Sequence, residues 1–67
     1  MLRIIVRKVH LTDEMEAWNI VLKQGEREIT LALPVEWNFH QTFWVAHDIW
    51  MALPARETWG TEIEVEE

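Results

Sequence analysis

Cysteine, serine and tyrosine are absent from this chain of 67 residues. Without cysteine, the chain has no disulfide, no thiolate zinc ligand and no cysteine nucleophile. Without serine and tyrosine, it also lacks the commonest hydroxyl nucleophile and the phenolic acid. These absences indicate a non-catalytic protein. The missing cysteine is also typical of intracellular proteins, and we expect a cytoplasmic location.

Glycine and proline are scarce, being confined to Gly25, Gly60, Pro34 and Pro54. So few glycines exclude the glycine-rich loops that hold phosphates or dinucleotides, and no cofactor is expected. The chain has no linker or low-complexity tract, which predicts a single domain over residues 1–67. A domain of this size buries only about 60% of its unfolded surface, so self-association is one way to gain stability.

Basic residues are few: six Lys and Arg stand against twelve Asp and Glu, giving a net charge of -6. A negative charge of this size repels the phosphate backbone and disfavours direct nucleic-acid binding. The alternative is a nucleic-acid surface on Arg3, Arg7 and Lys8, which lie in a segment without acids. No apolar run approaches the roughly 20 residues that span a bilayer, so no membrane segment is predicted.

Residues 17–33 carry the clearest strand pattern, because apolar residues alternate with polar ones on both sides of one glycine. The alternating residues are Trp18, Ile20, Leu22, Ile29, Leu31 and Leu33. A two-residue loop at Gln24-Gly25 predicts a β-hairpin that puts all six on one face. The predicted partners are Lys23 with Glu26, Leu22 with Arg27, Ile20 with Ile29 and Trp18 with Leu31.

Two further strands are predicted at the ends of the chain. In residues 2–11 the apolar residues change parity, from Leu2, Ile4 and Val6 to Val9 and Leu11. A bulge near Arg7-Lys8 would restore one apolar face, and the alternative is a strand buried on both faces. The last strand, Trp59 to Val65, alternates apolar residues with an acidic outer face formed by Glu62, Glu64 and Glu66.

One amphipathic helix is predicted from Asn38 to Leu53. Asn38 and Gln41 have the spacing of a capping box, and Pro54 stops the helix. At 100° per residue, one broad apolar face is expected to pack on the sheet. Its members are Phe39, Thr42, Phe43, Ala46, Ile49, Trp50 and Leu53. Trp18 and Trp59 are in phase with the same core.

The predicted order is therefore β-β-β-α-β, an α+β two-layer sandwich with a four-stranded mixed sheet and one helix on one face. A right-handed crossover would make the last strand parallel to the first. Because the first strand is basic and the last is acidic, they are good neighbours. This favours the sheet order 3-2-1-4 over the alternative order 1-2-3-4.

Histidines and carboxylates give little support for a metal or catalytic site. His40 and His47 lie two helical turns apart, about 10.5 Å, which is too far to chelate one ion. The acidic strand spaces its carboxylates by about 6.6 Å, as some glycosidase pairs are spaced, but any alternating acidic strand does so. The alternative to a binding module is an acid/base enzyme or enzyme subunit that brings His10 to a Glu at an interface.

Trp44 stands opposite the core face of the predicted helix, with His40, His47 and Met51 beside it. Trp is enriched at interface hot spots, and Met adapts its shape to a partner. The competing interpretation is a lone exposed Trp without a function. The sequence thus favours a small acidic protein-binding module that binds through this stripe or through the acidic strand. An enzyme inhibitor and a homodimer are two forms that such a module can take.

Overall fold

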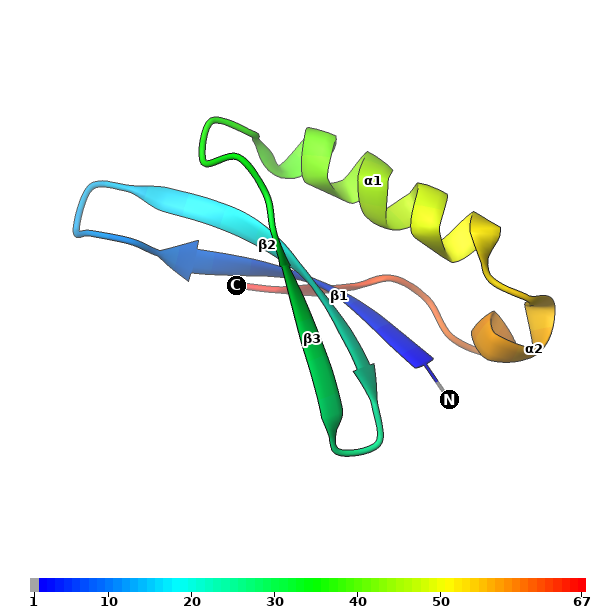
Figure 1. Ribbon diagram of the computed structural model, residues 1–67. Coiled ribbons are helices and arrows are strands. Elements are labelled where there is room, and N and C mark those ends of the chain that lie inside the picture. The colour runs from blue at the N-terminus through cyan, green and yellow to red at the C-terminus, as the bar shows by residue number, and fades with distance from the viewer. Residues whose placement is uncertain (1) are drawn as a thin grey trace.

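The structure is a computed structural model that describes residues 2–67, and it contains one sheet and two helices (Figure 1). The elements are β1 (Leu2–His10), β2 (Glu16–Gln24), β3 (Arg27–Ala32), α1 (Phe39–Ala52), α2 (Ala55–Thr58) and β4 (Glu64–Glu66). The strands lie in the order β3-β2-β1-β4. β4 runs parallel to β1, and the other neighbours are antiparallel. The predicted α+β architecture and the order 3-2-1-4 are confirmed.

Both ends of α1 agree with the prediction from the sequence. The Asn38 side chain accepts a hydrogen bond from the Gln41 amide at 2.9 Å, and the Gln41 side chain accepts one from the Asn38 amide at 2.9 Å. This reciprocal pair satisfies two backbone donors that the first helical turn leaves free. Leu53 forms the C-cap, immediately before Pro54. The capping box therefore sets where α1 begins.

The core lies between α1 and the central strands β1 and β2. Thr42 and Ala46 are fully buried on the inner face of α1. Because both side chains are small, the helix backbone can approach the sheet closely. The buried cluster joins Ala46 to Ile4, Val6 and Ile20, and larger side chains pack around it. These flanking residues are Trp18, Leu22, Leu31, Leu33, Phe39, Phe43, Val45, Ile49, Trp50, Leu53 and Ile63.

The β2–β3 hairpin forms, but its predicted register was wrong by two residues. The loop is Gly25-Glu26, with Gln24 opposite Arg27 and Ile20 opposite Leu31. Gly25 has a φ of 61°, and non-glycine residues in the described chain have no positive φ. This is the pattern of a type II′ turn, in which glycine occupies the first loop position. A loop at Gln24-Gly25 would place glycine second instead.

The predicted bulge in the first strand does not form. β1 pairs with β2 without interruption from Leu2 opposite Gln24 to His10 opposite Glu16. Ile4, Ile5 and Val6 are all buried, so the centre of β1 is buried on both faces, which was the alternative interpretation. A bulge would have broken this long ladder to turn two further apolar residues inward.

The last strand is shorter than predicted, because the chain turns twice before it reaches β1. α2 begins after Pro54, and the Thr61 amide then donates to the Thr58 carbonyl at 3.0 Å. Trp59 lies between these turns and is 80% exposed, so its predicted place in the core was wrong. Glu64 to Glu66 alone form β4, and Ile63 is the residue of this segment that packs on the core.

We predict that Asn38→Ala lowers the free energy of unfolding by about 1 kcal/mol, because the substitution removes the acceptor for the Gln41 amide. Asn38→Asp keeps an acceptor and adds a negative charge at the positive end of the helix dipole, so its stability should remain within about 0.5 kcal/mol of wild type. Urea unfolding followed by circular dichroism measures both. Equal destabilisation by the two variants would contradict a capping role.

Candidate protein-binding surface

The outer stripe of α1 consists of His40, Trp44, His47 and Met51, which recur at helical spacing opposite the buried Thr42 and Ala46. Trp44 is 62% exposed and Met51 is 63% exposed. His40 is exposed, and His47 is half-buried. The structure therefore brings together all four helical residues that the sequence singled out.

Aromatic contacts connect the outer stripe to the core. The Trp44 ring meets the His47 ring edge to face, with their centroids 5.6 Å apart. The His47 ring in turn stacks on Trp50, with centroids 6.3 Å apart, and Trp50 packs against the core. Such contacts restrict the rotamers of Trp44 before any partner arrives, which lowers the entropy lost on binding.

A shallow groove of about 340 Å³ adjoins the outer stripe. Its lining comes from α1 and from the segment that precedes β4: Phe43, His47, Trp50, Glu62 and Ile63. The Nε1 atom of Trp50 is buried and has no hydrogen-bond partner in the described part of the chain. The sequence assigned Trp50 to the core alone. The alternation of residues 59–65 did not predict that Glu62 would lie on the side of the helix.

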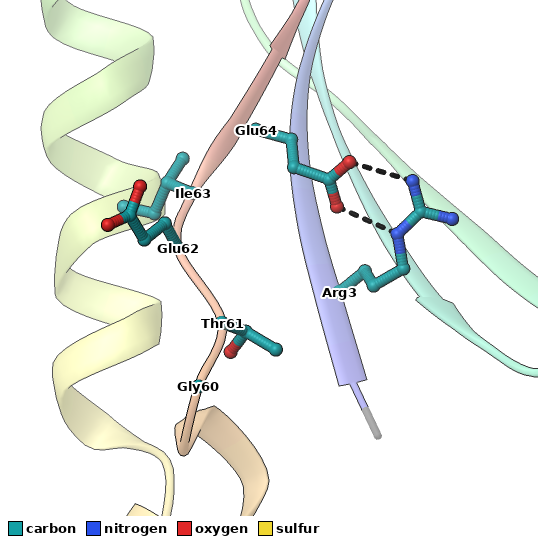
Figure 2. Close-up of a pocket in the computed structure, with 6 residues that line it drawn as sticks. All are labelled: Arg3, Gly60, Thr61, Glu62, Ile63 and Glu64. Carbon is teal, nitrogen blue, oxygen red and sulfur yellow. Dashed lines mark hydrogen bonds and ion pairs between the residues drawn. The ribbon is translucent and has the colours of Figure 1, made fainter.

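The three acidic residues predicted to share one strand face are not all together. Figure 2 shows Glu64 directed toward Arg3, while Glu62 lies on the side of α1. Glu62 precedes β4, so the two-residue alternation of a strand does not hold it beside Glu64. Residues 60–64 and Arg3 line an open pocket of about 690 Å³ at this edge (Figure 2).

Glu64 and Glu66 are engaged in ion pairs on the face of the sheet opposite α1. The Arg3 guanidinium donates two hydrogen bonds of 2.7 Å to the Glu64 carboxylate. Arg7 donates to Glu66 at 2.9 Å and to Glu28 at 3.1 Å, so it links β4 to β3 across the sheet. The acidic side chains of β4 are therefore largely neutralised by basic side chains of β1, as the predicted strand order required.

These ion pairs shift the acid–base equilibria of their members. The hydrogen bonds between Arg3 and Glu64, together with the attraction of their opposite charges, lower the pKa of Glu64 and raise the pKa of Arg3. At the far end of β1, a hydrogen bond from Lys8 at 2.9 Å lowers the pKa of Glu16. All of these groups are partly exposed to solvent, which screens the attraction and keeps each contribution to stability small.

The catalytic and metal alternatives gain little from the geometry. His10 does approach a carboxylate, with its Nδ1 atom 3.6 Å from Glu16, but both side chains are open to solvent. A general acid or base benefits from a site that shifts its pKa, and neither His10 nor Glu16 lines the groove beside α1 or the open pocket beside Arg3. Within residues 2–67, no three His, Asp or Glu side chains gather to hold a metal ion.

Neither helix in the described part of the chain has the length and apolar character needed to cross a bilayer. Comparisons with protein-family models, with curated proteins and with solved structures give no match to this chain.

We predict that the protein loses stability as the pH falls below about 5, partly through Glu64. Because folding lowers the pKa of Glu64, the unfolded chain takes up the proton more readily, and acid favours unfolding. Glu64→Gln should therefore flatten the dependence of unfolding free energy on pH in the acid range.

Glu62→Gln is the matched control, because Glu62 forms no ion pair with the described residues and should retain the wild-type pH dependence. Urea titrations at several pH values measure the slopes. A Glu64→Gln curve that runs parallel to wild type would show that the Arg3 pair does not couple folding to pH.

Proposed function

We propose that this protein is a non-catalytic protein-binding module that docks on a larger protein through the outer stripe of α1. The single observation that carries this proposal is Trp44, a large aromatic side chain that is 62% exposed on the helix face away from the core. An inhibitor of a larger enzyme is one form of such a module. We place its action in the cytoplasm.

The chemistry of the outer stripe suits a protein partner. Trp44 offers broad apolar area and an indole N–H donor, and Trp is enriched among the few residues that dominate binding energy. Met51 is 63% exposed beyond it and can adapt to an irregular partner surface. His40 and His47 add polar ring atoms at the side, where they can orient a partner through hydrogen bonds.

The acidic residues take a secondary part in this proposal. An inhibitor that imitates nucleic-acid charge needs carboxylates that are free to meet a basic site. Arg3 already holds Glu64, and Arg7 holds Glu66, so such a partner would have to displace these arginines. The overall charge of -6 still favours partners with a positive surface by speeding their encounter with this chain.

We predict that Trp44→Ala weakens binding to the partner by at least roughly 30-fold, the loss typical of a hot-spot residue. The partner is first captured with a tagged wild-type chain from cells of the native host, identified by mass spectrometry and purified. Its affinity for each variant is then measured by calorimetry.

Trp59→Ala is the matched control, because Trp59 is 80% exposed but lies outside α1. We expect this variant to bind like wild type, and Met51→Ala to show an intermediate loss. Equal affinities for wild type and Trp44→Ala would overturn the proposed function, as would an equal loss in the two Trp variants.

A further inference from the structure

The outer edge of β3 is open. β3 pairs with β2 on one side, and no other strand of residues 2–67 pairs with it on the other. Natural proteins block such an edge with charged side chains, proline or a bulge, because its free backbone groups accept another strand. β3 contains no proline or bulge, and its two charged residues, Arg27 and Glu28, lie at the hairpin end, so the stretch from Ile29 to Ala32 is uncharged.

The type II′ turn determines which backbone groups of β3 point outward. A two-residue loop closes on a hydrogen-bonded pair, here Gln24 and Arg27, and such pairs recur at every second residue. Ile29 and Leu31 therefore direct their amides and carbonyls toward β2. The amides and carbonyls of Glu28, Thr30 and Ala32 point away from the sheet.

β3 also presents apolar area beside this edge. Ile29 lies on the α1 side of the sheet, opposite the core residue Leu22, yet it is 60% exposed. Figure 1 shows the reason, because the turn of the β2–β3 hairpin projects away from α1, and the helix does not reach it. An apolar side chain next to an unpaired strand edge is the combination that favours strand addition.

We propose that two copies of this chain associate through β3, pairing antiparallel about a two-fold axis at Thr30. Thr30 then faces Thr30 of the partner subunit, and Glu28 faces Ala32 of the partner subunit. Every outward amide and carbonyl from Glu28 to Ala32 meets a counterpart, and Ile29 packs beside Leu31 of the partner subunit on the α1 side.

Charge selects this register over its nearest competitor. An axis at Ile29 would keep the same faces but would bring the two Glu28 side chains within two residues of each other, about 6.6 Å along the strand. The axis at Thr30 separates them by four residues, about 13 Å. A pairing shifted by an odd number of residues, such as Ile29 opposite Thr30 of the partner subunit, would place apolar side chains on the wrong face of the joint sheet.

The dimer forms one eight-stranded sheet with both copies of α1 on the same face. Both outer stripes then point to the same side, so the assembly presents two docking surfaces to a partner. Association also covers the exposed Ile29 and supplies stability that a domain of this size gains with difficulty on its own. This inference is independent of the proposed function, because β3 and the outer stripe share no residue.

Light scattering tests the assembly directly. We predict that the mass of wild type rises with concentration from 8.1 kDa toward twice that value, whereas Thr30→Pro stays at 8.1 kDa. Proline removes an outward amide that β2 does not use, so it is tolerated at such an edge. Thr30→Val keeps the amide and should dimerise, and Trp44→Glu should also dimerise, since the outer stripe is not involved.

Cysteine cross-linking tests the register in the folded protein, and the natural chain has no cysteine to interfere. Across the two-fold axis, paired Cα atoms lie about 5.5 Å apart, within disulfide range, so oxidised Thr30→Cys should become a covalent dimer. Glu28→Cys and Ile29→Cys should remain uncross-linked under the same mild oxidation. A monomeric wild type at millimolar concentration, a dimer lost in Trp44→Glu, or preferential cross-linking of Ile29→Cys would each overturn the proposal.

Discussion

The packing of α1 against the β1–β2 pair is the contact on which the rest of the molecule depends. Thr42 and Ala46 are small enough to bring the helix against Ile4 and Val6, and this close approach fixes the rotation of α1 about its axis. Once the rotation is fixed, Trp44 has no inner position available and must point outward. The exposure of Trp44 is therefore a consequence of how the core packs, and an interaction through its side chain requires no change in that packing.

The other face of the sheet is closed by charged side chains instead of a second helix. Ile5 and Val21 are buried there as a cross-strand pair. Arg3 and Arg7 flank Ile5 on that face, and their ion pairs with Glu64 and Glu66 hold the aliphatic parts of these side chains along the sheet. The two faces of the central strands are thus covered differently, one by α1 and the other by the paired Arg and Glu side chains.

Much of the fold could be predicted because local and long-range patterns agreed. The capping residue Asn38, the stop at Pro54 and the charge contrast between the terminal strands were each sufficient to place an element. The errors arose where a pattern was short. The choice of loop beside Gly25 depends on the sign of φ at a single residue, and Trp59 alternates like a strand residue although α2 and the turn after it expose its side chain. The open edge of β3 follows from the predicted strand order, whereas the groove beside Trp50 arises from tertiary arrangement, which alternation along the chain does not encode.

The parallel pairing of β4 with β1 joins the two ends of the chain, since Ile5 lies opposite Glu64. A contact of such high sequence separation is entropically costly to close, so we expect it to form after the local hairpins and α1. β4 has three residues of ladder and one neighbouring strand, so few backbone hydrogen bonds hold it in place. In hydrogen exchange, we expect the β4 amides to open early through local unfolding, whereas the longer β1–β2 ladder should persist until global unfolding.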